Sequence, residues 1–284
     1  MSIVSNFAAE PNRLEMLVNF LKSVTRGYTK TELEELFSPS SGRGESSVFK
    51  EVYSVADSLG IIELEEQDSG ASLVQLNHHL KKEPLISYIE NQIFKQEFVL
   101  KDKFSFAAAW LLIQNPQNPI DWADNISSRV TQDLSNGEFG ELELTNNSRS
   151  QHFSYWCQYL GFSSKVSISG KTHIIPDPTP AILRHLKSIF QDSKEVEIEK
   201  FLNVIVEKLP VLERGWIRDK VESVSREGLQ RNENELSYST SLALLRLEEK
   251  GIIKLLSKSD ANVMRLNSAA NRRISHIQYT GVKK

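Results

Sequence analysis

A short apolar motif that starts at a glycine occurs twice in the chain. It reads Gly-Ile-Ile-Glu-Leu at residues 60–64 and Gly-Ile-Ile-Lys-Leu at 251–255. Each copy follows a stretch whose apolar residues recur at helical spacing, and each precedes a polar turn and a second apolar segment, at 74–77 or 264–267. A helix that ends at glycine and continues into two strands joined by a turn restricts the chain to a small module of helix plus β-hairpin.

The first copy of this motif is preceded by three predicted helices. The second of them, over 32–37, is capped by Thr29 or by Thr31, and Glu34 stands three residues after Thr31 as in a capping box. The third helix ends at Gly60. Three helices followed by a β-hairpin is the order of elements in a winged-helix domain.

The same order is predicted twice more along the chain. In the middle, a helix that ends at Gly161 precedes a hairpin over 163–175. In the last third, a connector helix over 179–190 is followed by three helices and by the Gly251 hairpin, whose second strand is 264–267. We therefore predict a mostly α fold with small β-hairpins (α+β), arranged as three tandem winged-helix-like domains over 1–82, 83–178 and 179–284.

The overall charge sets a limit on DNA binding. The net charge is −3, whereas domains that bind DNA without sequence preference are usually basic. A local patch can still bind phosphate, and residues 261–284 carry basic side chains but no carboxylate side chain. This basic tail is either a ligand site or a solvated, frayed end.

The remaining composition predicts an ordinary cytoplasmic protein. Cys157 is the one cysteine, so no internal disulfide can form. The longest apolar run, 104–113, is too short to span a bilayer, so we expect no membrane association. The first 25 residues lack the apolar core of a signal peptide.

In a winged helix, the start of the third helix reads the major groove and the hairpin contacts phosphate. The residues at 146–152 are the best such surface, because amide and guanidinium groups can pair with base edges. The alternative is that they only cap the helix. The corresponding helix start in the third domain, 235–241, is poorer. The candidate contacts are Asn146, Asn147, Arg149, Gln151, His152, Lys165, Lys171, Arg43, Lys50, Arg265, Arg272 and Arg273.

Catalytic and metal-binding patterns are not evident. The Gly-Lys-Thr at 170–172 lacks the first glycine and the following helix of a phosphate-binding P-loop. The histidines do not combine with a second cysteine at metal-ligand spacing, and Cys157 is expected to be a buried, inert thiol. We therefore predict a non-enzymatic protein without cofactor, metal or small-molecule substrate. The tryptophans fall in apolar helical stripes and are predicted to lie in the core: Trp110, Trp122, Trp156 and Trp216.

The opening of the chain carries three short stretches: Met-Ser-Ile-Val at 1–4, Pro-Asn-Arg-Leu at 11–14 and Glu-Leu-Phe-Ser-Pro-Ser at 35–40. They resemble the DpdG proteins, which belong to bacterial operons that restrict foreign DNA in concert with 7-deazaguanine DNA modification. The tandem pattern also resembles the kite subunits of condensin-like machines, which dock onto large ATPases. Neither resemblance implies a catalytic residue.

These observations lead to two main hypotheses. The first is a double-stranded-DNA-binding accessory subunit of a bacterial phage-defence or DNA-processing complex, with the other subunits of that complex as partners. The second is a protein-binding scaffold that docks onto an ATPase or nuclease. A transcriptional repressor is less favoured, because it needs a dimer and no dimerisation heptad is evident.

Overall fold

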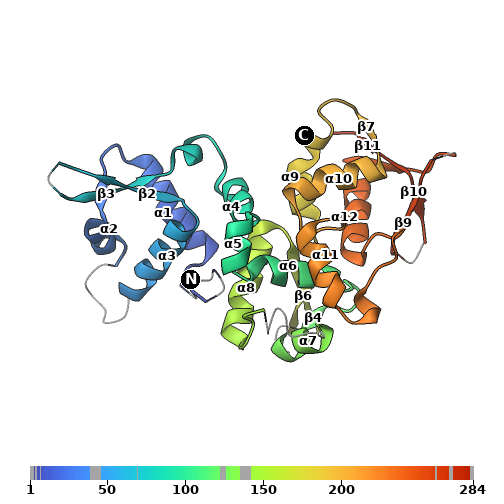
Figure 1. Cartoon of the computed structure of the whole chain (residues 1–284), viewed down its shortest axis with the longest axis horizontal. Helices are drawn as coiled ribbons and strands as arrows, with labels where there is room; N and C mark the ends of the chain where they lie inside the picture. The colour runs from blue at the N-terminus through green and yellow to red at the C-terminus, as the bar shows by residue number, and fades with distance from the viewer. Residues whose placement is uncertain are drawn as a thin grey trace. The chain divides into compact units, whose positions relative to one another are not determined.

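The structure, a computed structural model, describes residues 3, 5–6, 8–38, 46–68, 70–121, 126–134, 142–259, 261–268 and 271–281 (Figure 1). The chain divides into two compact units: unit 1 comprises residues 1–104 and 148–156, and unit 2 comprises 105–147 and 157–284. Helices dominate and the strands form small antiparallel sheets. The predicted α+β class is therefore confirmed, while the division into three domains stays a prediction.

Unit 1 begins with three helices and a three-stranded sheet. Its elements are α1 (Pro11–Ser23), β1 (Tyr28–Thr29), α2 (Lys30–Phe37), α3 (Ser46–Ser58), β2 (Ile62–Glu66), β3 (Ser72–Leu76), the 3₁₀ helix η1 (His78–Lys81), α4 (Leu85–Ile93) and α5 (Gln96–Lys101).

The capping box of α2 lies two residues earlier than the sequence predicts. The Thr29 hydroxyl accepts a hydrogen bond from the backbone N–H of Glu32 at 3.2 Å, and the Thr29 N–H donates to the Glu32 carboxylate at 2.7 Å. Of the two predicted caps, Thr29 is therefore confirmed, and the capping box of Thr31 with Glu34 is wrong. The reason is β1, which holds Thr29 in extended backbone opposite Leu73 of β3, so the helix can only begin after it.

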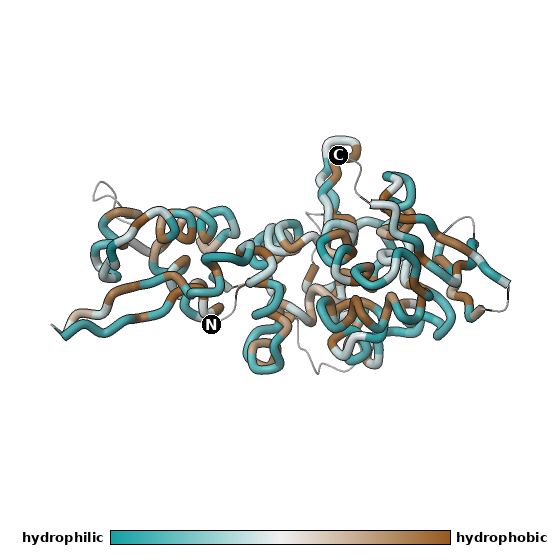
Figure 2. Tube along the Cα trace, turned by 90° about the horizontal axis from the view of Figure 1, so that it is seen from above, coloured by the Kyte–Doolittle hydropathy of each residue, from teal (hydrophilic) through white to brown (hydrophobic). Residues whose placement is uncertain are grey.

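The sheet of unit 1 has the strand order β1-β3-β2, and all of its pairs are antiparallel. The central strand β3 buries Val74 and Leu76 against the helices. The outer strand β2 is exposed beyond Ile62. Figure 2 shows both hydrophobic and hydrophilic stretches along this hairpin.

Unit 2 contains two further sheets of this kind. The elements from α6 onwards are α6 (Phe104–Ile113), β4 (Ile120–Asp121), α7 (Ile126–Asp133), α8 (Asn147–Leu160), β5 (Ser163–Ile168), β6 (Lys171–Pro176), α9 (Thr179–Ile189), β7 (Glu195–Glu197), α10 (Ile198–Lys208), α11 (Trp216–Val224), η2 (Glu227–Leu229), α12 (Tyr238–Glu249), β8 (Ile253–Leu256), β9 (Met264–Arg265), β10 (Arg273–Ile274) and β11 (His276–Tyr279). Helix α8 contributes residues 148–156 to unit 1, and its first residue and last turn to unit 2.

The three helices α3, α8 and α12 end in the same way. Each is followed by a glycine in the left-handed region: Gly60, Gly161 and Gly251, with φ of +64°, +76° and +66°. The N–H of the residue after each glycine donates to the carbonyl five residues earlier, at 2.8, 2.8 and 2.9 Å. This is the hydrogen bond of a Schellman motif, so the predicted glycine ends of these three helices are confirmed.

The three sheets also share one strand order. They run β1-β3-β2, β4-β6-β5 and β7-β11-β8, each antiparallel throughout. In each, the last strand lies in the middle and a short strand between two helices forms one edge. The sequence does not predict β1, β4 or β7, because strands of two or three residues leave no detectable periodicity.

The third sheet corrects two predictions. Strand β8 pairs with β11, and not with the predicted segment 264–267, part of which forms a separate two-stranded sheet of β9 and β10. Because β11 (His276–Tyr279) is the central strand of this sheet, the alternative that the basic tail is a frayed end is excluded for those residues. Helix α10 begins at Ile198, directly after β7, which occupies residues 195–197.

The predicted core tryptophans do not all lie in the core. Trp110 and Trp156 are fully buried, whereas Trp216 is 45% exposed. Trp216 is the first residue of α11 and contacts Phe106 edge-on, with ring centroids 6.4 Å apart. The helix end leaves one side of its indole uncovered, so its predicted burial is wrong. Trp122 lies outside the described residues.

Candidate nucleic-acid surfaces

The start of α8 presents a mixed surface. Asn146, Asn147 and Gln151 are exposed, and the Gln151 amide donates a hydrogen bond to the hydroxyl of Tyr155 at 2.8 Å. His152 is only 3% exposed, so its ring belongs to the packed side of the helix. The amide groups at this helix start remain accessible to a ligand.

Arg149 and the lysines of the β5–β6 hairpin have local constraints. Arg149 is half-buried on α8. Lys171 is exposed but forms an ion pair with Asp121 of β4, with 3.3 Å between the ammonium nitrogen and the carboxylate. Lys165 is half-buried, and this burial lowers its pKa. The hairpin belongs to unit 2 and Arg149 to unit 1, so the two surfaces are separate observations.

In the first module, carboxylates offset the positive charge of the candidate residues. Lys50 on α3 forms an ion pair with Glu34 of α2, at 3.5 Å. Arg43 lies outside the described residues. The hairpin itself is acidic, with four exposed carboxylates along its outer strand and turn, which repel phosphate: Glu63, Glu65, Glu66 and Asp68.

Two of the three tail arginines are engaged within unit 2. Arg265 forms an ion pair with Glu235. Arg272 donates to both carboxylate oxygens of Glu248, at 2.5 and 3.1 Å. Burial alone would raise the pKa of Glu248, but these hydrogen bonds and one from backbone lower it. Arg273 is exposed and lies opposite Arg265 in the β9–β10 pair, so the structure brings these two candidates together.

The helix start of the third module is closed to a ligand over most of its length. Ser239, Thr240 and Ser241 are buried. The Ser239 hydroxyl donates to the carbonyl of Leu112 at 2.6 Å, and the Ser241 hydroxyl accepts from the backbone N–H of Asn267 at 2.8 Å. These residues hold α12 in place, as expected from a helix start that the sequence marks as the poorer DNA-binding surface.

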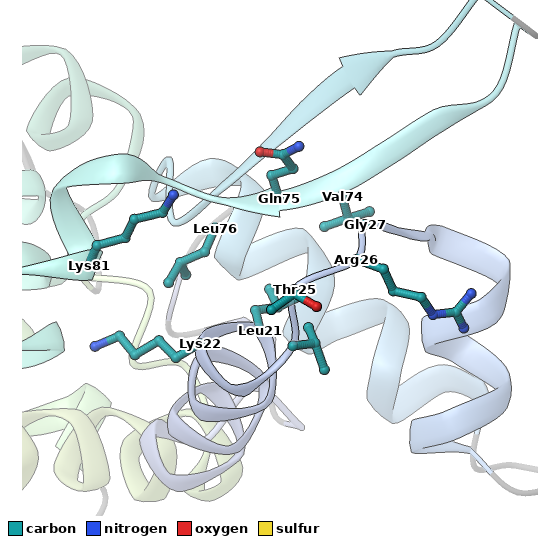
Figure 3. Close-up of a pocket in the computed structure, with 10 residues that line it drawn as sticks. Leu21, Lys22, Thr25, Arg26, Gly27, Val74, Gln75, Leu76 and Lys81 are labelled. Carbon is teal, nitrogen blue, oxygen red and sulfur yellow. The ribbon is translucent and has the colours of Figure 1, made fainter.

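A basic groove in unit 1 was not predicted from the sequence. It encloses about 340 Å³ between the end of α1, the α1–β1 loop, β3 and η1. Figure 3 shows Lys22 and Lys81 on one side of the groove and Arg26 at its other end. Lys22 and Lys81 are exposed and form no ion pair with a described residue. Lys22 also lies in the last turn of α1, where a cation is favoured by the helix dipole.

Local packing holds Arg26 at its end of the groove. Its guanidinium lies over the ring of Tyr28, 4.1 Å from the centroid, and 3.6 Å from a carboxylate oxygen of Glu32. Gly27 lets this loop approach β3, since a Cβ there would lie 2.8 Å from a methyl carbon of Leu73. Lys81 lies 55 residues after Arg26 and still farther from Lys22 in the sequence, so only the fold, through the pairing of β1 with β3, brings these cations to one groove.

Catalytic features are not found among the described residues. Within that part of the chain, His, Cys, Asp and Glu form no group of three that could hold a metal ion. Burial raises the pKa of the Cys157 thiol well above its ordinary value, so the thiol stays protonated. The described helices include none with the length and apolar character needed to cross a membrane.

Comparison with known proteins gives one family. The family described as DpdG-like matches residues 1–261. Neither the curated proteins nor the solved structures contain a match to this chain. The family match covers most of the chain, including all three glycine-ended helices, whereas the resemblance in the sequence rests on the first 40 residues.

Proposed function

The chain belongs to the DpdG-like family, and we propose from this premise that it is a non-enzymatic accessory subunit that binds double-stranded DNA in a bacterial phage-defence or DNA-processing complex. Family membership points to a role in a DNA-modification or defence system. DNA binding, the winged-helix assignment and the absence of catalysis are our proposals.

The observation that carries the proposal is the threefold repeat of one module. A helix closed by a left-handed glycine leads into an edge strand that pairs with the central strand of a three-stranded antiparallel sheet, and this arrangement occurs three times. Winged-helix domains have this order, and they use a helix and the adjacent hairpin to engage the DNA groove and backbone. The repeat therefore supports three tandem winged-helix domains.

We assign the first phosphate contacts to the basic groove of unit 1. Lys22 and Lys81 are free of ion pairs with described residues, so binding a phosphate requires no internal partner to be released. Arg26 adds a third positive charge to the lining. The exposed amides at the start of α8 are the second surface, because they can pair with base edges.

The groove is tested with the double variant Lys22→Glu, Lys81→Glu in a gel-shift series over salt concentration. Two lost phosphate contacts should reduce the slope of log K against log salt by about 1.8. The matched control is Lys187→Glu, Lys200→Glu, which reverses two exposed lysines of α9 and α10. The groove assignment fails when both double variants weaken binding equally.

The start of α8 and the β5–β6 hairpin, two separate surfaces, are tested together by Arg149→Glu, Lys165→Glu, Lys171→Glu. We expect duplex binding to be lost. Affinity equal to that of the unaltered chain would exclude both. If this triple variant and the groove variant both retain the original affinity and salt slope, the proposed DNA-binding role is wrong.

A second function, docking onto a protein partner, is favoured by the acidic first hairpin. Leu64 is 58% exposed in the edge strand β2, between carboxylates that would repel DNA phosphate. An exposed edge with an apolar residue and a uniform charge suits a basic protein surface. Proteins of the same operon should be retained by the chain in high salt and released by Leu64→Lys. Retention unchanged by that variant would exclude the hairpin as the docking site.

The proposal assigns no catalytic residue. We therefore expect the purified chain with Mg²⁺ to leave plasmid DNA intact and ATP unhydrolysed. Turnover that co-purifies with the chain through successive columns and is altered by a single substitution in it would show that the protein is an enzyme.

A further inference from the structure

Unit 2 contains a pocket lined by four arginines. It encloses about 260 Å³ between the end of α6, helix α7, the α11–η2 segment and the start of α12. The four arginines come from three segments: Arg129 lies on α7, Arg218 on α11, and Arg226 and Arg231 in the chain that follows α11. So many guanidinium groups around a small pocket are unusual, because like charges repel one another unless a counter-charge is present.

A buried carboxylate organises one wall of this pocket. Asp133 is 2% exposed and accepts hydrogen bonds from the Trp110 indole at 3.0 Å, the Gln114 amide at 3.0 Å and Nε of Arg226 at 2.8 Å. Arg226 thereby uses Nε alone, and its two terminal nitrogens donate to no described residue. Arg129 donates only to the Gln114 amide oxygen, at 3.0 Å, so it has no carboxylate partner in the described chain.

Arg218 gives the strongest indication of a ligand. It is 1% exposed, and its Nε donates to Glu222 at 2.6 Å. Its Nη1 is buried and has no hydrogen-bond partner among the described residues. A buried guanidinium nitrogen without an acceptor is costly, and such groups in a folded protein call for an explanation such as a bound ion.

The carboxylates around the pocket do not cancel its positive charge. Glu222 lies between two of the arginines, being also 3.4 Å from Nε of Arg231. Glu213 is buried beside Arg218, and Asp133 binds Arg226. Glu235 lines the pocket but forms an ion pair with an arginine outside it, Arg265. Four guanidinium groups thus face three carboxylates, which leaves a surplus of positive charge.

We propose that this pocket binds the phosphate group of a phosphomonoester. A tetrahedral phosphate accepts hydrogen bonds in several directions, which matches arginines that approach from separate segments, and guanidinium groups bind it in bidentate fashion. The pocket is smaller than the roughly 300–1,000 Å³ typical of ligand sites, so it suits a terminal phosphate. Tyr238, 37% exposed in the lining, offers a ring to an attached nucleoside. This site does not depend on the proposed duplex-binding groove.

The site is tested on the full chain by calorimetry and thermal unfolding with inorganic phosphate, against chloride of equal ionic strength. Phosphate should bind and raise the unfolding temperature. Arg129→Ala removes a guanidinium without leaving a carboxylate unpaired, and should weaken phosphate binding about ten- to a hundredfold. Arg273→Ala is the matched control, since it removes an exposed guanidinium of the same unit and should bind phosphate normally.

Further probes identify the source of the phosphate and separate this site from duplex binding. Deoxyadenosine monophosphate represents a free nucleotide, and a 5′-phosphorylated trinucleotide, compared with its 5′-hydroxyl form, represents a DNA end. Tighter binding of either phosphorylated probe than of its unphosphorylated form supports the site. Binding by Lys22→Glu, Lys81→Glu should be unchanged. Phosphate no better than chloride, or equal losses in Arg129→Ala and Arg273→Ala, would overturn the proposal.

Discussion

Replacing Asp133 should destabilise unit 2 more than any replacement of a surface carboxylate. Its two oxygens accept three hydrogen bonds, from Trp110, Gln114 and Arg226. Trp110 and Gln114 are 0% and 1% exposed, so the lost acceptor is a buried one. The perturbation to make is Asp133→Ala, with Asp133→Asn as a gentler form of the same change.

The magnitude follows from what each donor loses. A buried donor left without a partner costs about 1–3 kcal/mol, and Asp133→Ala leaves two of them. Arg226 is 56% exposed at its side chain and can be solvated, so its part is small. Two such donors make the expected loss about 2–6 kcal/mol. Asp133→Asn keeps one acceptor oxygen but turns an amide donor toward a second donor, and should cost about 1.5–3 kcal/mol.

The measurement is urea unfolding followed by tryptophan fluorescence, with far-ultraviolet circular dichroism as a second probe because the chain has two units that can unfold separately. The control is Asp192→Ala, which removes an exposed carboxylate from the loop before β7 and should leave unfolding nearly unchanged. If Asp133→Ala and Asp192→Ala shift the unfolding free energy by the same amount, Asp133 does not hold the wall of the arginine pocket.

Two further predictions concern the glycine ends and one buried acid. Gly161→Ala should cost more stability than Gly251→Ala: both glycines have positive φ, which alone costs an alanine about 1–2 kcal/mol, but a Cβ at Gly161 would lie 2.8 Å from Pro180 while nothing lies within 4 Å of one at Gly251. Chemical unfolding of both variants checks this, and equal losses would contradict it. Burial by itself raises the pKa of Glu213, but Arg218 and hydrogen bonds from the start of α12 lower it below its ordinary value. The ionised group therefore stabilises the fold above about pH 4.3, and this contribution is lost as the pH falls toward the folded pKa. Glu213→Gln should be less stable than the original chain at pH 7, and the difference in unfolding free energy should shrink in acid. Unfolding is measured for both chains from pH 7 to pH 3, and a difference that does not change with pH would exclude this role.

The sequence predicts the parts of the fold that depend on local chemistry. The ends of α3, α8 and α12 are correct because a left-handed backbone position favours glycine wherever it occurs. The partner of β8 is wrong because strand pairing depends on where the chain returns, and residues 264–267 have the same apolar pattern as the real partner, β11. Short edge strands such as β4 are too short for a periodic apolar pattern to indicate them. They form because their backbone pairs with a neighbouring hairpin strand, here β6.

The candidate site was less predictable, because a list of basic residues does not say which of them are already paired. Lys171 and Arg265 have the residue type and position of phosphate contacts, yet each is neutralised by a carboxylate that lies far from it in the sequence. Lys22 and Lys81 have no sequence signal, and they become candidates through the fold that places them along one groove.

Ion pairing also decides how each cation could bind DNA. An exposed pair such as Lys171 with Asp121 contributes only about 0–1 kcal/mol, so a phosphate can replace the carboxylate with little loss. Arg272 differs, because it donates to both oxygens of Glu248 and also to a backbone carbonyl, that of Leu255. Moving that guanidinium to a phosphate would leave several acceptors without a donor. Arg265 and Arg272 therefore mainly stabilise unit 2. Of the candidate cations, Lys22 and Lys81 of the unit 1 groove and the exposed Arg273 can bind a DNA phosphate without breaking an internal ion pair.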